Sequence, residues 1–180
     1  MASARTLAAS EIEAFHRDGF LLVEDVFDPA RLADFGAAVD AAVAGRAGSD
    51  PRALAEKSLY EQSFIQCINL WEDSTAVRRF TFDPGLGEMA AALRGADAVR
   101  IWHDQALYKE AGGRETDPHQ DQPYWAIAEP RTNTAWIPFQ AVGPGNGATG
   151  FLAGSHRSGL REFADIFTGS GLDLAAFPAT

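Results

Sequence analysis

The spacing of apolar residues predicts a short amphipathic helix near the start of the chain. Ile12 and Phe15 fall on one side of that helix, as residues three positions apart do. Residues 10–13 (Ser-Glu-Ile-Glu) match a capping box, and Gly19 is typical of a helix end, so the helix is expected between them. The apolar run at residues 20–23 then predicts a short buried strand.

A longer helix is predicted by the next group of apolar residues. It starts at residues 28–29 (Asp-Pro), because an aspartate before a proline is a typical helix start, and it runs to about Val43. Its apolar face consists of Leu32, Phe35, Val39 and Val43. Residues 54–93 are expected to be mostly helical or irregular, with a break at residues 83–85 (Asp-Pro-Gly).

The pattern changes to alternation near residue 98, which predicts strands. They are expected at residues 99–108, 132–142 and 148–152. Residues 143–147 (Gly-Pro-Gly-Asn-Gly) give a strong turn signal between the last two strands. One face of the first strand carries His103, Gln105 and Lys109.

Length and order of elements indicate one α+β domain over residues 1–180, rich in β structure. A hydrophobic content of 46% is enough for a packed core. Residues 10–95 form its mainly helical part and residues 98–156 its strands, while residues 157–180 are a tail with no structural prediction.

Charge and cysteine content narrow the possible partners. The formal net charge of −10 argues against nucleic acid or an anionic membrane as a partner. No run approaches the roughly 20 apolar residues of a membrane span. The single cysteine, Cys67, lies in an apolar run and is expected to be buried. One cysteine allows no intrachain disulfide, which suits a reducing, cytoplasmic setting.

The densest chemistry is the segment from Asp117 to Trp125, which contains His119 and Asp121 one residue apart. In an extended backbone these two side chains point to the same side and can meet one metal ion. One nitrogen and one oxygen ligand suit Fe(II), Mn(II) or Zn(II). The spacing alone is weak, because a histidine hydrogen-bonded to a nearby aspartate is the commoner outcome.

Four blocks, in order, give this pair its context. They are residues 13–20 (EAFHRDGF), 103–109 (HDQALYK), 119–125 (HQDQPYW) and 134–138 (TAWIP), the last leading to Gly154-Ser155-His156. With these blocks the chain resembles the phytanoyl-CoA dioxygenase family of Fe(II)- and 2-oxoglutarate-dependent oxygenases. The resemblance extends over roughly residues 10–160 and corresponds to about the first two-thirds of such an enzyme.

The resemblance implies a fold, cofactors and a reaction. The fold is a double-stranded β-helix, or cupin-like jelly roll, with helices packed outside it. A facial triad of two histidines and one carboxylate holds Fe(II) and leaves positions for 2-oxoglutarate and O₂. The implied reaction is hydroxylation of a small organic substrate, with release of succinate and CO₂.

The family pattern also assigns residues. His119 and Asp121 match the first two metal ligands. Lys109 and Trp136 match positions beside 2-oxoglutarate, and Gln105, Tyr124 and Trp125 are candidates for the substrate cavity. Each of the latter five also has a structural interpretation, as a solvated strand-end lysine or as packing. His103 and His156 are interpreted as structural and His16 as a surface residue.

The match ends before the family's third ligand. No histidine follows His156, and Arg157 and Arg161 come too early to match the arginine that binds 2-oxoglutarate. The jelly roll is therefore expected to be incomplete, with the C-terminal third missing and open sheet edges that favour self-association. The alternative to a dioxygenase is a catalytically incomplete jelly-roll fragment or pseudoenzyme with a binding role.

Overall fold

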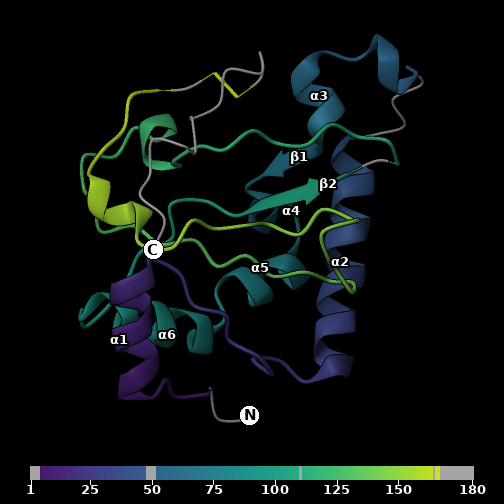
Figure 1. Ribbon diagram of the computed structural model, residues 1–180. Coiled ribbons are helices and arrows are strands. Elements are labelled where there is room, and N and C mark those ends of the chain that lie inside the picture. Colours follow the sequence, from purple (N-terminus) through teal and green to yellow (C-terminus); the bar gives the residue numbers. More distant parts are fainter. Residues whose placement is uncertain (1–4, 48–51, 110, 164, 167–180) are drawn as a thin grey trace.

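The computed structural model describes residues 5–47, 52–109, 111–163 and 165–166. The elements in chain order are α1 (Ala9–Asp18), α2 (Pro29–Ala47), η1 (Leu54–Glu56), α3 (Leu59–Ser63), β1 (Ile65–Ile68), α4 (Leu70–Asp73), α5 (Thr75–Thr81), α6 (Pro84–Arg94), β2 (Gln105–Tyr108), η2 (Gln122–Tyr124) and η3 (Ser155–Ser158). Figure 1 shows that helices dominate the first half of the chain, whereas the second half follows a looping, extended path. No helix within the described ranges is long and apolar enough to cross a membrane.

The two N-terminal helices form where the sequence predicts them, except that the start of α1 is shifted and α2 extends to Ala47, beyond the predicted end near Val43. The N-cap of α1 is Ala8, two residues before the predicted cap Ser10, because the Glu11 carboxylate accepts a hydrogen bond from the Ala8 amide at 2.8 Å. Helix α1 ends as predicted at Gly19, whose φ of 87° suits glycine. At the start of α2, the Asp28 carboxylate accepts from the Ala30 amide at 3.0 Å, as expected for a cap before Pro29.

The core lies where α2 packs against β1, α4 and α5 (Figure 1). Its buried members are Val39, Val43, Cys67, Leu70 and Val77. Val39 and Val43 confirm half of the predicted apolar face of α2, and the burial of Cys67 confirms its structural interpretation.

The described residues form one two-stranded antiparallel sheet, in which Cys67 of β1 pairs with Ala106 of β2. The strands predicted at residues 20–23, 132–142 and 148–152 are absent from it, and only the end of the predicted 99–108 strand forms. Alternation alone does not make a strand, because each strand needs a hydrogen-bonded partner. The apolar side chains of these segments are partly exposed, with Leu22 at 80% and Phe151 at 61%. The jelly roll stays a prediction.

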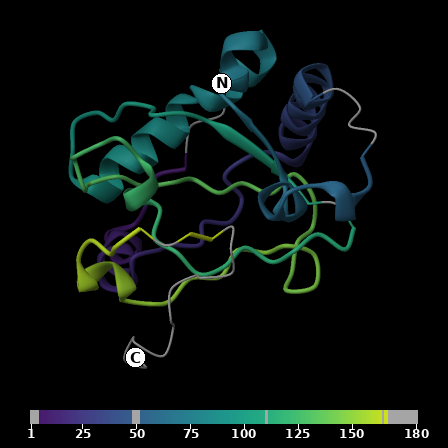
Figure 2. The same cartoon turned by 90° about the horizontal axis from the view of Figure 1, so that it is seen from above.

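Helix α1 is closed at its C-terminal end by residues from the far end of the chain. The amide of Gly154 donates to the Asp18 carbonyl at 2.7 Å, and His156 Nε2 lies 3.1 Å from the His16 carbonyl oxygen. The Arg157 guanidinium donates to the Arg17 carbonyl. Both views show η3 beside the end of α1 (Figures 1 and 2).

Candidate metal centre

His119 and Asp121 lie in the irregular segment that leads into η2. The backbone of Asp121 is helical, with φ −66° and ψ −38°, so the extended backbone expected across the pair is wrong at this residue. The side chains nevertheless lie together, with His119 Nε2 3.2 Å from Asp121 Oδ1, a contact that suits both the metal-ligand and the hydrogen-bond interpretations of the pair. The local turn that begins η2 therefore brings the two donors together.

Both nitrogens of the His119 ring face oxygen atoms. Nδ1 lies 2.8 Å from the Asp117 carbonyl oxygen, on the side opposite Asp121. The hydrogen bond with Asp121 raises the pKa of His119, burial opposes that rise, and the bond to the Asp117 carbonyl adds to it. Because the ring has an oxygen acceptor on each side, a cation between Nε2 and Oδ1 is stabilised. That cation is either a proton or a metal ion.

The pair has the geometry of two neighbouring metal ligands. Ligand bonds of about 2.1 Å that meet near a right angle place the two ligand atoms about 3.0 Å apart, and the observed separation is 3.2 Å. An Nδ1–H bonded to a backbone carbonyl leaves the Nε2 lone pair for a metal, as in most metal-bound histidines. The side chains are 27% and 50% exposed, so an ion can reach them.

The donor set fits two of the three positions of a facial triad. Across the described ranges, no group of three His, Cys, Asp or Glu side chains could hold a metal ion. The pair therefore supplies two donors, and the third ligand stays a prediction.

Tyr124 is the predicted substrate residue that the structure brings to the pair. Its ring meets the His119 ring edge-on, with centroids 5.7 Å apart, and packs against Phe163 at 4.8 Å. Burial raises the pKa of the Tyr124 hydroxyl. Trp125 instead meets the ring of His103 edge-on at 6.4 Å. Tyr124 thus borders the candidate centre directly, whereas the role of Trp125 in substrate binding stays a prediction.

Lys109 points its ammonium at main-chain carbonyls. Its Nζ donates to the carbonyls of Ser63 at 3.0 Å and Arg114 at 2.9 Å, and burial lowers the pKa of the group. Gly147 packs on the Lys109 stem so closely that an added Cβ would lie 3.1 Å from its Cδ. These contacts give Lys109 a structural role in this conformation, and its contact with 2-oxoglutarate stays a prediction.

Gln105 and Trp136 lie on the surface of the described structure. Gln105 accepts a hydrogen bond from Gln66 across the two strands at 2.8 Å. Trp136 is 42% exposed, so its packing interpretation accounts for only part of the ring. Their proposed ligand contacts also stay predictions.

Sequence reasoning missed the residues that surround the pair. Arg114 donates to the Asp117 carboxylate at 2.8 Å, and Gln120 bonds to the Gly159 carbonyl at 3.2 Å and to the Arg161 amide at 2.9 Å. Gln120 lies between the two predicted ligands in the sequence, so its position alone could have indicated a role beside the pair. The partners of Arg114 and Gln120 carried no such signal, since some lie about 40 to 50 residues away in the chain.

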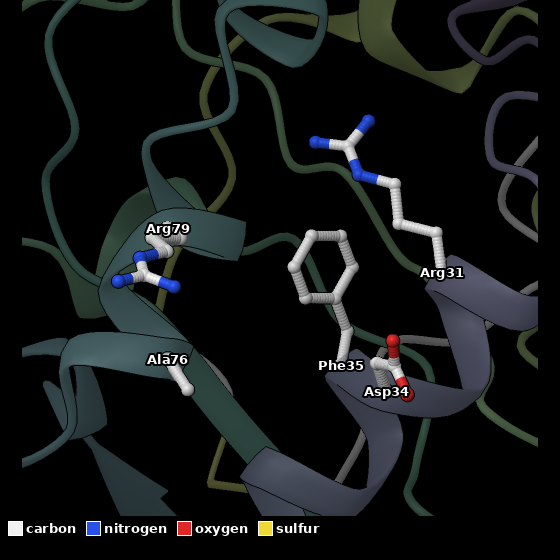
Figure 3. Close-up of a pocket in the computed structure, with 5 residues that line it drawn as sticks. All are labelled: Arg31, Asp34, Phe35, Ala76 and Arg79. Atoms are coloured by element: carbon white, nitrogen blue, oxygen red, sulfur yellow. The ribbon is translucent and has the colours of Figure 1, made fainter. Parts of the chain in front are cut away.

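A hollow of about 290 Å³ lies elsewhere, between α2 and α5, as Figure 3 shows. Its lining residues are Arg31, Asp34, Phe35, Ala76 and Arg79, and none of them was a predicted site residue. Arg31 already pairs with Asp83 and stacks on Phe35.

Comparison with known proteins adds two matches. The sequence model of the phytanoyl-CoA dioxygenase family matches residues 15–168. Ectoine dioxygenase of Sphingopyxis alaskensis is 28% identical over 163 residues, which make up 86% of this chain and 51% of that protein. The chain thus spans about half the length of this curated relative. No solved structure matches the chain.

Proposed function

The chain belongs to the phytanoyl-CoA dioxygenase family, and from this premise we propose that His119 and Asp121 are two of the ligands in an Fe(II)- and 2-oxoglutarate-dependent dioxygenase site. The proposed reaction hydroxylates a small organic substrate and releases succinate and CO₂. The observation that carries the proposal is the contact of His119 Nε2 with Asp121 Oδ1 at 3.2 Å, with Nδ1 bonded to the Asp117 carbonyl.

Fe(II) held by His119 and Asp121 would supply the chemistry that activates 2-oxoglutarate and O₂. The protein's part follows from its own side chains. The Asp117 carbonyl holds the His119 proton on Nδ1, so that Nε2 is free to bind a metal. The Asp121 carboxylate supplies negative charge beside it, and the edge of Tyr124 limits how far the imidazole can rotate.

The proposed activity requires a third ligand and a group that grips 2-oxoglutarate. Within the described part of the chain His119 and Asp121 have no third partner of the right type. This observation favours one second candidate, a protein that binds metal or small molecules through the pair without turnover. Activity and metal binding measured on the same sample separate the two candidates.

The substrate is proposed to be a small polar or amphipathic metabolite. A net charge of −10 gives no support for binding a polyphosphate group such as that of a coenzyme A ester. Ectoine is the first compound to test, since the relative carries that substrate in its name. At 28% identity the substrate needs its own experiment.

The test is succinate formation from 2-oxoglutarate, measured with and without Fe(II), in the wild type, His119→Ala and Asp121→Ala. We expect Fe(II)-dependent succinate in the wild type and none in either variant. His16→Ala is the matched control, because His16 is an exposed histidine on α1. Unchanged turnover in His119→Ala would refute the proposed ligands, and metal binding without any succinate in the wild type would favour the second candidate.

A further inference from the structure

Arg114 joins three parts of the chain at the edge of the metal pair. Its backbone amide donates to the Gln62 carbonyl of α3 at 3.0 Å, and Nη1 donates to the Ile166 carbonyl at 3.1 Å. Nη2 donates to the Asp117 carboxylate at 2.8 Å. The side chains of Arg114 and Asp117 are only 26% and 23% exposed, so this ion pair is more shielded than a surface pair.

Asp117 is the residue whose carbonyl orients His119. Pro118 follows it, and a residue before proline is restricted to extended conformations. The backbone at Asp117 therefore has little freedom, and the clamp on its carboxylate fixes the remaining rotation. Through this one residue, the position of the Arg114 guanidinium is linked to the direction of the His119 ring.

We propose that Arg114 is a positioning residue for the metal pair, acting through Asp117. It holds the Asp117 carbonyl against His119 Nδ1, so that Nε2 faces the Asp121 carboxylate. The proposal rests on the proposed function only where it concerns metal affinity, because the orientation of His119 is measurable without a metal.

The ion pair between Arg114 and Asp117 also determines which of two aspartate carboxylates, that of Asp117 or that of Asp121, can contact His119 Nε2. Asp117 and Asp121 lie two residues before and two residues after His119 in the chain, and both contact its ring. Arg114 engages the Asp117 carboxylate and leaves that of Asp121 next to Nε2. A planar guanidinium holds the Asp117 carboxylate and the Ile166 carbonyl at once, a geometry that a lysine ammonium does not reproduce.

The experiment compares Arg114→Ala, Asp117→Ala and the double variant. Arg131→Ala is the matched control, since Arg131 forms an exposed pair with Glu129 at 2.9 Å in the same part of the chain. Co(II) affinity is measured by visible absorption, with His119→Ala as the reference for loss of a ligand. Each single variant is expected to lose about tenfold or more in affinity, as outer-shell changes do, and the double variant is expected to lose no more than one single variant.

The second readout is the protonated nitrogen of His119, measured by ¹⁵N NMR in metal-free protein at alkaline pH, where the ring is neutral. The wild type and Arg131→Ala should carry the proton on Nδ1. Arg114→Ala and Asp117→Ala should shift it toward Nε2, next to Asp121.

The outcomes separate the two proposals. Equal Co(II) affinity in the wild type and His119→Ala would refute the metal pair, and the NMR result would then decide the role of Arg114 alone. Wild-type affinity and an unshifted proton in Asp117→Ala would overturn the positioning role, as would affinity losses that add in the double variant. Asp117→Ala leaves the bonds of Arg114 to Gln62 and Ile166 in place, so it decides the question even if Arg114→Ala fails to fold.

Discussion

Replacing Asp104 with alanine is expected to destabilise the protein by about 3 kcal/mol. The Asp104 carboxylate, just before β2, accepts hydrogen bonds from the amides of Leu70 at 3.0 Å and Trp71 at 3.2 Å, and from the Thr81 hydroxyl at 2.9 Å. It thus satisfies the open N-terminal amides of α4 and ties that helix to α5. Removing an acceptor from a buried donor costs about 1–3 kcal/mol.

The low end of that range applies here, because the three bonds are only partly buried and water reaches some of the freed donors. About 1 kcal/mol for each of three donors gives the total.

The assay is urea unfolding followed by tryptophan fluorescence, because Trp71 lies beside the site of change. Asp97→Ala is the control, since Asp97 is an exposed aspartate outside the core. A loss below about 0.5 kcal/mol, the range of ordinary surface changes, would refute the argument that Asp104 satisfies the start of α4.

Three further predictions concern the helix end and the metal pair. Gly19→Ala is expected to lower the melting temperature, because Gly19 has a φ of 87° and an added Cβ would lie 2.3 Å from His156 Nδ1. The double variant Gly19→Ala/His156→Ala removes the clash and should recover part of the lost stability. A Gly19→Ala variant as stable as the wild type would contradict this packing. The pKa of His119 is raised in the folded protein, so the charged ring contributes stability that is present below the ordinary histidine pKa of about 6.5 and is lost as the pH rises through the folded value. Urea unfolding of metal-free wild type and His119→Gln should therefore differ more at about pH 5.5 than at about pH 8.5, and a larger difference at the higher pH would contradict the pairing with Asp121. Mn(II) at about 100 times its dissociation constant should stabilise the wild type by about 2.7 kcal/mol and leave Asp121→Ala unchanged in thermal unfolding, whereas equal shifts would place the metal elsewhere.

Local signals predicted the end of α1 and the start of α2, whereas α2 extends to Ala47, beyond the predicted end near Val43. The Asp28 carboxylate accepts from the Ala30 amide, and the Gly19 amide donates to the Phe15 carbonyl. Each of these bonds joins residues that are at most four positions apart, so the local sequence is enough to predict the helix end that the bond forms. The start of α1 was misplaced because two glutamates, Glu11 and Glu13, offer competing caps, and the first one forms the bond. Such choices between near neighbours depend on small differences in free energy.

The strands and the surroundings of the metal pair depend on distant partners. Strand β1 forms because Cys67 meets Ala106, 39 residues later, and alternation within one segment does not encode that pairing. The contact between His119 and Asp121 was predictable because the two residues are neighbours in the chain. The role of Arg114 was not, since its link to Ile166 closes a loop of 52 residues.

The junction between α1 and η3 has a consequence for how the protein forms during synthesis. The last three carbonyls of α1, those of His16, Arg17 and Asp18, are bonded by residues 154–157. These bonds at the end of α1 can form only after some 140 further residues have emerged from the ribosome. Until then the three carbonyls are bonded to water, and the contact that closes this end of the helix forms late, at the rate at which the two distant segments meet.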